Sequence, residues 1–182
     1  MEIKRMLQIT IPAGELWDEA REEIITVESC TIALEHSLVS LSKWESKWHK
    51  PFLSDKQKTQ EESLDYIRCM TITQNVPWYV YHLMTETNIK AINEYIDNPM
   101  TATTFSRQEN KKQNRSIITA EIIYYWMIAF NIPQEYQKWH LNKLLTLIQV
   151  CDIKNQPEKK MSKREIMNQH RSLNAARRAK RH

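Results

Sequence analysis

The stretch TIALEHSLVSLSKWESKW, residues 31–48, contains the point at which the chain changes its secondary structure. Before His36, Ile32 and Leu34 recur at every second position, which is typical of a strand with one buried face. After His36, apolar residues recur at every third or fourth position, which is typical of a helix, until Pro51 ends the run. These helical positions are Leu38, Leu41, Trp44 (or Glu45) and Trp48. The stretch therefore predicts a strand followed by a helix.

Other segments ahead of this point also have strand character. Leu7, Ile9 and Ile11 alternate with polar neighbours, and residues 24–27 are rich in β-branched side chains. Together with residues 31–36 they predict three short strands that form a small antiparallel sheet. We therefore expect a β-rich segment over residues 1–36.

Most of the chain after residue 37 has helical spacing. Ile89, Ile92 and Ile96 predict a short helix that closes at Asn98 and Pro99. Three Ser or Thr residues lie three positions before a Glu, which is the spacing of a capping box at a helix start. These pairs are Thr59 with Glu62, Ser106 with Glu109, and Ser162 with Glu165. The type of the aromatic segment after Pro77, VPWYVYHLM, stays open.

Two further helices are predicted near the end of the body. The segment IITAEIIYYWMIAF, residues 117–130, is apolar on nearly every side, so it predicts a central buried helix of about four turns. Its β-branched and aromatic content leaves a strand as the alternative. After Pro133, one amphipathic stripe consists of Tyr136, His140, Leu144, Leu147 and Cys151. The fold class expected is α+β and mainly α-helical, with a helical body over residues 37–154 and a basic, helical tail over 155–182.

The net charge of +4 is unevenly distributed along the chain. Residues 159–182 hold nine Lys or Arg and one acidic residue, Glu165, which is a net charge of +8, so the rest of the chain carries −4. An acidic body with a basic tail suggests that the tail meets nucleic acid, an acidic protein surface or solvent alone. Its apolar face is too narrow for a membrane anchor.

The sequence lacks the motifs that are typical of several classes of function. Gly14 is the only glycine, so the glycine-rich turns of nucleotide-binding loops and nucleophile elbows are absent. The three cysteines and six histidines show no metal-ligand spacing, and no disulfide framework is indicated. Glu121, inside the apolar segment, is expected at an edge or a helix terminus. We therefore predict no enzyme activity, cofactor, metal site or membrane segment, and we expect a soluble intracellular protein.

The candidate binding residues are basic and aromatic. In KWESKWHKPFL, residues 43–53, two Trp four positions apart are surrounded by lysines. This pattern favours a packed core or a protein interface, and stacking on single-stranded nucleic acid is the alternative. The predicted partner-binding residues are Lys43, Trp44, Lys47, Trp48, Lys163, Arg164, Arg177 and Arg178.

Several segments resemble a family of tailed-bacteriophage proteins. They are the run LEHSLVSLSKWESKW with the KPFL that follows it (residues 34–48 and 50–53), LDYI with CMT (64–67 and 69–71), EIIYYWMI (121–128), WHLNKLL (139–145) and KMSKREIM (160–167). These segments are spread along most of the length of residues 34–178. Such proteins are similar to those encoded among the structural genes of long-tailed phages. In these phages, small proteins encoded just ahead of the tape-measure gene serve as tail assembly chaperones.

The resemblance implies a non-enzymatic tail assembly chaperone or scaffold in the host cytoplasm. Its partner would be a phage tail protein such as the hydrophobic, helical tape-measure protein, and it could form a homo-oligomer. Two alternatives remain open: a nucleic-acid-binding protein that uses the basic tail and the Lys-Trp segment, and a minor component of the virion or its neck.

Overall fold

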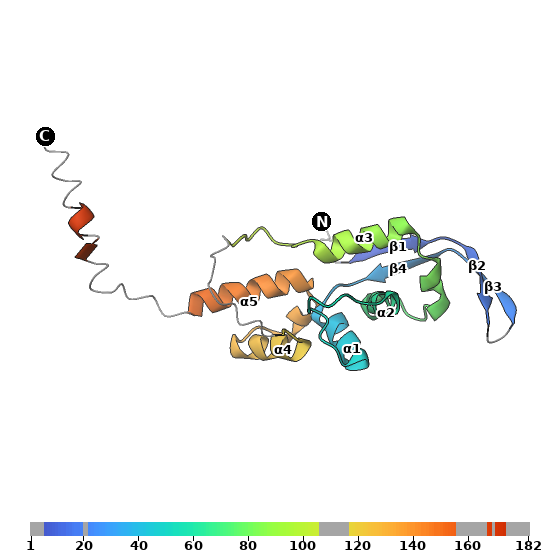
Figure 1. Cartoon of the computed structure of the whole chain (residues 1–182), viewed down its shortest axis with the longest axis horizontal. Coiled ribbons are helices and arrows are strands. Elements are labelled where there is room, and N and C mark those ends of the chain that lie inside the picture. Colours follow the sequence, from blue (N-terminus) through green and yellow to red (C-terminus); the bar gives the residue numbers. More distant parts are fainter. Residues whose placement is uncertain (1–5, 20–21, 106–116, 156–166, 169, 174–182) are drawn as a thin grey trace, which may run out of the picture. The chain divides into compact units, whose positions relative to one another are not determined.

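The computed structural model describes residues 6–19, 22–105, 117–155, 167–168 and 170–173. Four strands come first and helices follow (Figure 1), which confirms the prediction of a mainly helical α+β fold. The chain divides into two compact units, Met1–Cys151 and Asp152–His182, and each is described by itself. The predicted boundary between body and tail, after residue 154, lies at the end of the last described helix of the body, which ends at Asn155.

The strands form one long hairpin with an interruption. β1 (Leu7–Ile11) pairs with β4 (Cys30–Leu34), and β2 (Gly14–Asp18) pairs with β3 (Glu23–Val27), both antiparallel. The register is continuous, because Ile11 lies opposite Cys30 and Gly14 lies opposite Val27. In Figure 1 the β2–β3 pair continues from the β1–β4 pair. The three predicted strands correspond to β1, β3 and β4; β2 is a fourth, and the strands form two two-stranded sheets rather than one.

The interruption reverses which side chains of the hairpin face the core. Pro12 has no N–H to donate, and pairing stops at residues 12–13 and 28–29. Uninterrupted alternation would place Trp17 on the same face as the fully buried Ile11. Instead, Leu16 and Ile25 pack against the core, and Trp17 is 60% exposed. The outer part of the hairpin therefore presents an apolar pair, Trp17 and Ile24, away from the core.

Between the hairpin and residue 155, the described residues form five α-helices and two 3-10 helices. They are α1 (Leu38–Trp48), α2 (Gln60–Met70), η1 (Trp78–Leu83), α3 (Glu86–Asp97), α4 (Ala120–Ala129), η2 (Gln134–Lys138) and α5 (Leu141–Asn155). The predicted capping box of Thr59 and Glu62 begins α2. The other two predicted capping boxes fall outside the described residues. The aromatic segment after Pro77 is the 3-10 helix η1.

The described residues form two core clusters. The first joins the hairpin to α2, η1 and α3, and its members with at most 2% exposure include Ile11, Ile32, Tyr66 and Ile92. The second joins α1, α4 and α5 through residues such as Leu41, Ile123 and Leu144. α1 contributes to both clusters, since Trp44 belongs to the first. This helix therefore connects the two halves of the body.

The predicted role of residues 117–130 as a central buried element is wrong. The segment is helical, but only Ala120, Ile123 and Met127 of α4 are buried. Tyr125 is 66% exposed and Ile128 is 76% exposed. One side of α4 packs on the second cluster, and no described segment covers the opposite side.

The predicted stripe after Pro133 is only partly correct. Tyr136 lies in η2, and α5 begins at Leu141. The buried positions of α5 are Leu141, Leu144 and Ile148, while Leu147 and Cys151 are half-buried. Among the described residues, no helix combines the length and apolarity needed to cross a bilayer.

Candidate protein-binding surfaces

The Lys-Trp segment lies on α1, where it packs against α2. Trp44 is 1% exposed, and its Nε1 donates a hydrogen bond of 2.9 Å to the carbonyl oxygen of Glu62. Trp48 is half-buried and stacks near Trp44, with ring centroids 6.1 Å apart. The structure thus places Trp44 in the core, where a partner cannot reach it. Lys43 and Lys47 are exposed.

Two buried carboxylates of α2 bind this segment. Asp65 accepts hydrogen bonds from the ammonium of Lys47 and, at 2.8 Å, from Nε1 of Trp48. Burial opposes ionisation of Asp65, but these donors outweigh it and hold the pKa of its carboxyl below the ordinary value. Glu62 forms an ion pair with Lys50, and the hydrogen bond from Lys50 lowers the pKa of Glu62. Lys47 and Trp48 are therefore occupied by contacts within the protein.

Glu45, the neighbour of Trp44, connects α1 to α4. Its Oε1 accepts the N–H of Phe52 at 2.8 Å, and its Oε2 accepts the N–H of Ala120 at 2.7 Å. Thr119, the N-cap residue of α4, makes no side-chain capping bond, so the carboxylate of Glu45 satisfies an N–H of the first turn instead. Glu45 thereby fixes where α4 begins. Glu121 lies exposed in that first turn, at a helix terminus as predicted.

The outward side of α4 is an apolar surface. Tyr125 and Ile128 are three positions apart and therefore neighbours on one side of the helix, and Ala129 beside them is also exposed. Glu121, one turn before Tyr125, supplies the charge on this side. A surface helix of a globular protein ordinarily carries polar residues on its outward side. We call Tyr125, Ile128 and Ala129 the α4 outer face.

The tip of the hairpin carries a second exposed apolar surface, which sequence reasoning missed. Trp17 and Ile24 lie directly opposite each other, and they are 60% and 62% exposed. Trp78 of η1 is 56% exposed, and its ring lies edge-on to that of His82 at 5.5 Å. The adjacent residues Leu16 and Trp17 indicate this surface in the sequence. Successive side chains of a strand point to opposite faces, so one of the two must lie away from the core.

Two histidines far apart in the sequence meet in the buried junction between the clusters. The rings of His36 and His140 are 5.0 Å apart. The hydroxyl of Tyr66 lies 2.7 Å from Nδ1 of His36, and Nε2 of His140 lies 2.9 Å from the carbonyl oxygen of Tyr95. Since a carbonyl only accepts, Nε2 of His140 donates, and its buried Nδ1 has no partner among the described residues.

Burial, with a smaller contribution from the neighbouring His140, lowers the pKa of His36 to about 3. Burial also lowers the pKa of His140. Both rings are therefore neutral at pH 7. The backbone supports the same junction, because the N–H of Leu141 donates to the carbonyl of His36 at 2.9 Å. The cluster ties the end of β4 to the start of α5.

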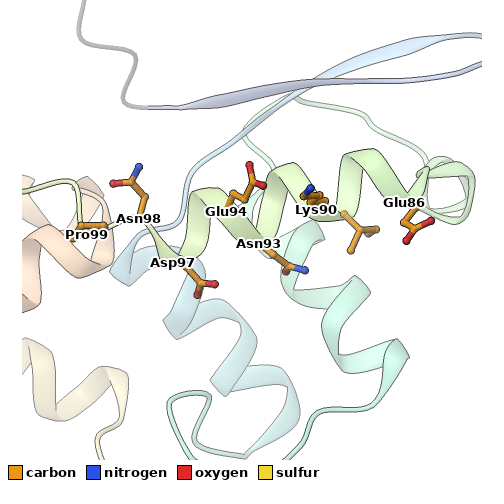
Figure 2. Close-up of a pocket in the computed structure, with 8 residues that line it drawn as sticks. Glu86, Lys90, Asn93, Glu94, Asp97, Asn98 and Pro99 are labelled. Atoms are coloured by element: carbon orange, nitrogen blue, oxygen red, sulfur yellow. The ribbon is translucent and has the colours of Figure 1, made fainter.

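A shallow hollow of about 670 Å³ lies along α3. Figure 2 shows the side chains that line it, including Glu86, Lys90, Glu94 and Asp97. Most of them come from exposed positions of α3 and the turn after it, and no buried polar group lines the hollow. The hollow is therefore best interpreted as a solvated helix surface. Within the described ranges, no group of His, Cys, Asp and Glu is arranged to hold a metal ion.

The predicted tail residues Lys163, Arg164, Arg177 and Arg178 lie outside the described residues. In the described part of the tail, Met167 and Leu173 are 70% and 51% exposed. The role of the tail in binding stays a prediction.

Comparisons of the chain with protein-family models, with curated proteins and with solved structures found no match.

Proposed function

We propose that this protein is a non-catalytic phage tail assembly chaperone or scaffold that binds a helical segment of another tail protein, such as the tape-measure protein, through the α4 outer face. Two independent arguments support the proposal. The first is the resemblance of several segments within residues 34–178 to proteins of phage structural modules. The second is the exposed apolar side of α4.

The exposure of Ile128 carries the structural part of the argument. This side chain is 76% exposed on a helix whose opposite side, at Ile123 and Met127, is packed into the core. Soluble proteins rarely expose contiguous apolar side chains, and such patches often mark interaction sites. An amphipathic helix is recognised by an apolar surface that accepts its anchor residues at helical spacing. A tape-measure chain, being helical and hydrophobic, offers such anchors.

The structure offers less support for nucleic-acid binding by the Lys-Trp segment. Stacking on bases requires an accessible aromatic face, and Trp44 is 1% exposed. Lys47 and Lys50 are paired with Asp65 and Glu62. The charge of the basic tail is the remaining argument for this alternative.

Co-purification from infected cells tests the proposal. The tagged protein is isolated after nuclease treatment, bound proteins are identified by mass spectrometry, and purified virions are assayed for the same chain. Recovery of a tape-measure chain, with none of this protein in the virion, supports the proposal. Loss of every partner after nuclease favours nucleic-acid binding, and presence in the virion favours a structural component.

A matched pair of variants locates the surface. Ile128→Ser changes the α4 outer face, and Ile72→Ser makes the same change at another exposed position, which is 45% accessible. We expect Ile128→Ser to weaken client binding by about tenfold, which corresponds to about 1.4 kcal/mol, with an unchanged melting temperature. Equal effects of both variants on binding would contradict the assignment of the site to α4.

A further inference from the structure

The tip of the β2–β3 hairpin and helix η1 form an apolar groove that is separate from the α4 outer face. The groove has a volume of about 260 Å³, and its lining includes Leu16, Trp17, Ile25, Trp78 and His82. Two exposed tryptophans, Trp17 and Trp78, come from different elements and both line the groove. Large exposed aromatic side chains of this kind are typical anchors of protein interfaces.

The hairpin that contributes Leu16, Trp17, Asp18 and Ile25 to the groove is rich in acidic residues. Residues 14–28 hold six carboxylates and one basic residue, Arg21. The carboxylates are Glu15, Asp18, Glu19, Glu22, Glu23 and Glu28. Asp18 lines the groove and lies opposite Glu23 in the strand register. An occupant that complements this surface must be both basic and apolar.

The chain itself contains a segment with this chemistry. Residues 159–182 carry nine basic residues and one acidic residue, together with apolar side chains such as Met167 and Leu173, which are exposed. We propose that the acidic, aromatic groove at the hairpin tip binds the basic segment 159–182 of a second copy of this protein. This interaction does not depend on the proposed function, because it uses neither the α4 outer face nor a client.

The groove and α5 belong to different core clusters of the body. The groove is built on the first core cluster, through Leu16 and Ile25. α5, which leads toward the tail, packs in the second cluster through Leu144 and Ile148. The contact can be reciprocated in a two-fold dimer, in which each tail binds the groove of the other copy, or repeated around a ring or along a filament.

Sedimentation velocity of the full-length, nuclease-treated protein tests the proposal over a series of concentrations at low and high salt. We expect association that strengthens with concentration at about 50 mM salt and falls at least tenfold at about 500 mM, because the rim charges are exposed and screened. Trp17→Ala should weaken the association about tenfold at low salt. A single-chain mass under every condition would overturn the proposal.

Charge reversal separates a specific contact from a general effect of net charge. Glu15→Lys with Glu19→Lys changes the hairpin rim, and Glu94→Lys with Asp97→Lys makes the same total change on α3 (Figure 2). The hairpin pair should abolish self-association and the α3 pair should leave it intact. Equal effects of the two pairs would overturn the proposal, as would no effect of either pair.

A complementary variant identifies the partner surface. Arg177→Glu with Arg178→Glu should also abolish self-association, and mixing this protein with the Glu15→Lys, Glu19→Lys protein should restore a hetero-complex. Unchanged melting temperatures show that each variant is folded. Failure of the mixture to associate would overturn the assignment of the tail as the occupant. Client binding through α4 is measured separately, so failure of one proposal leaves the other open.

Discussion

The carboxylate of Glu45 in α1 accepts the backbone N–H of Ala120 in α4 at 2.7 Å, across 75 residues of sequence. The same side chain accepts the N–H of Phe52 at 2.8 Å. One buried glutamate thus caps the helix that carries the proposed client-binding face and also holds the turn after its own helix.

Replacement of Glu45 should destabilise the protein and loosen the start of α4. Glu45→Ala leaves two N–H groups without their acceptor, and we expect a loss of about 2 kcal/mol in the free energy of unfolding. Glu45→Gln retains one acceptor oxygen and should fall between the wild type and the alanine variant. Urea denaturation measures both, with Ser46→Ala on the exposed side of α1 as the control. Equal stability of Glu45→Ala and the wild type would contradict the capping role.

The two tryptophans of α1 should differ in their effect on stability. Trp44 is 1% exposed and hydrogen-bonded to the carbonyl of Glu62, so Trp44→Ala should cost about 3–5 kcal/mol. Trp48 is half-buried, so Trp48→Ala should cost clearly less. Chemical denaturation of each single variant decides the matter. A larger loss at Trp48 than at Trp44 would be incompatible with the packing of α1 on α2.

Acid should weaken the fold through His36. The pKa of this buried ring is lowered to about 3, below the 6.5 of an exposed histidine, so between these values the unfolded chain binds more protons than the folded one. Its stabilising contribution is therefore complete above pH 6.5 and declines as pH falls toward 3, by about 3 kcal/mol at pH 4.

Unfolding at several pH values between 7 and 4 measures this contribution. His36→Gln should be less stable than the wild type at pH 7 but should lose less stability as pH falls, since the titrating ring is absent. The carboxyls of Glu62 and Asp65 and the ring of His140 titrate in both proteins, so the difference between the two curves reports His36 together with its coupling to His140. His82→Gln, at an exposed position, is the matched control. Parallel curves for wild type and His36→Gln would refute the expectation.

The effect of a substitution at Gly14 on stability is expected to depend on the side chain at position 83. A Cβ added at Gly14 would lie 2.8 Å from Cδ2 of Leu83, so the Leu83 side chain would have to move. Gly14→Ala should cost about 1 kcal/mol in the wild type and be neutral or stabilising in a Leu83→Ala background, where the space is free. A double-mutant cycle measures the coupling. Additive changes in the free energy of unfolding would show that the close approach of Gly14 to Leu83 of η1 does not require a glycine.

Local signals in the sequence predicted many of the elements. The change of period at His36 predicted β4 followed by α1, and the Thr59 and Glu62 pair predicted the start of α2. These predictions succeeded because a strand or helix with one buried side repeats its apolar residues at its own period. β2 was missed because the unpaired gap at Pro12 shifts the alternation, so that Leu16 and not Trp17 packs against the core.

The sequence by itself determined the fold class, the order of most elements and the separation of charge between body and tail, because these depend on neighbouring residues. Only the tertiary structure decided which apolar side chains are left exposed and which polar ones are buried. It brought His36 beside His140 and Glu45 to Ala120, and it left Tyr125, Ile128 and Trp17 uncovered by any described segment. Burial depends on what packs against each face, and segments distant in the sequence supply those contacts.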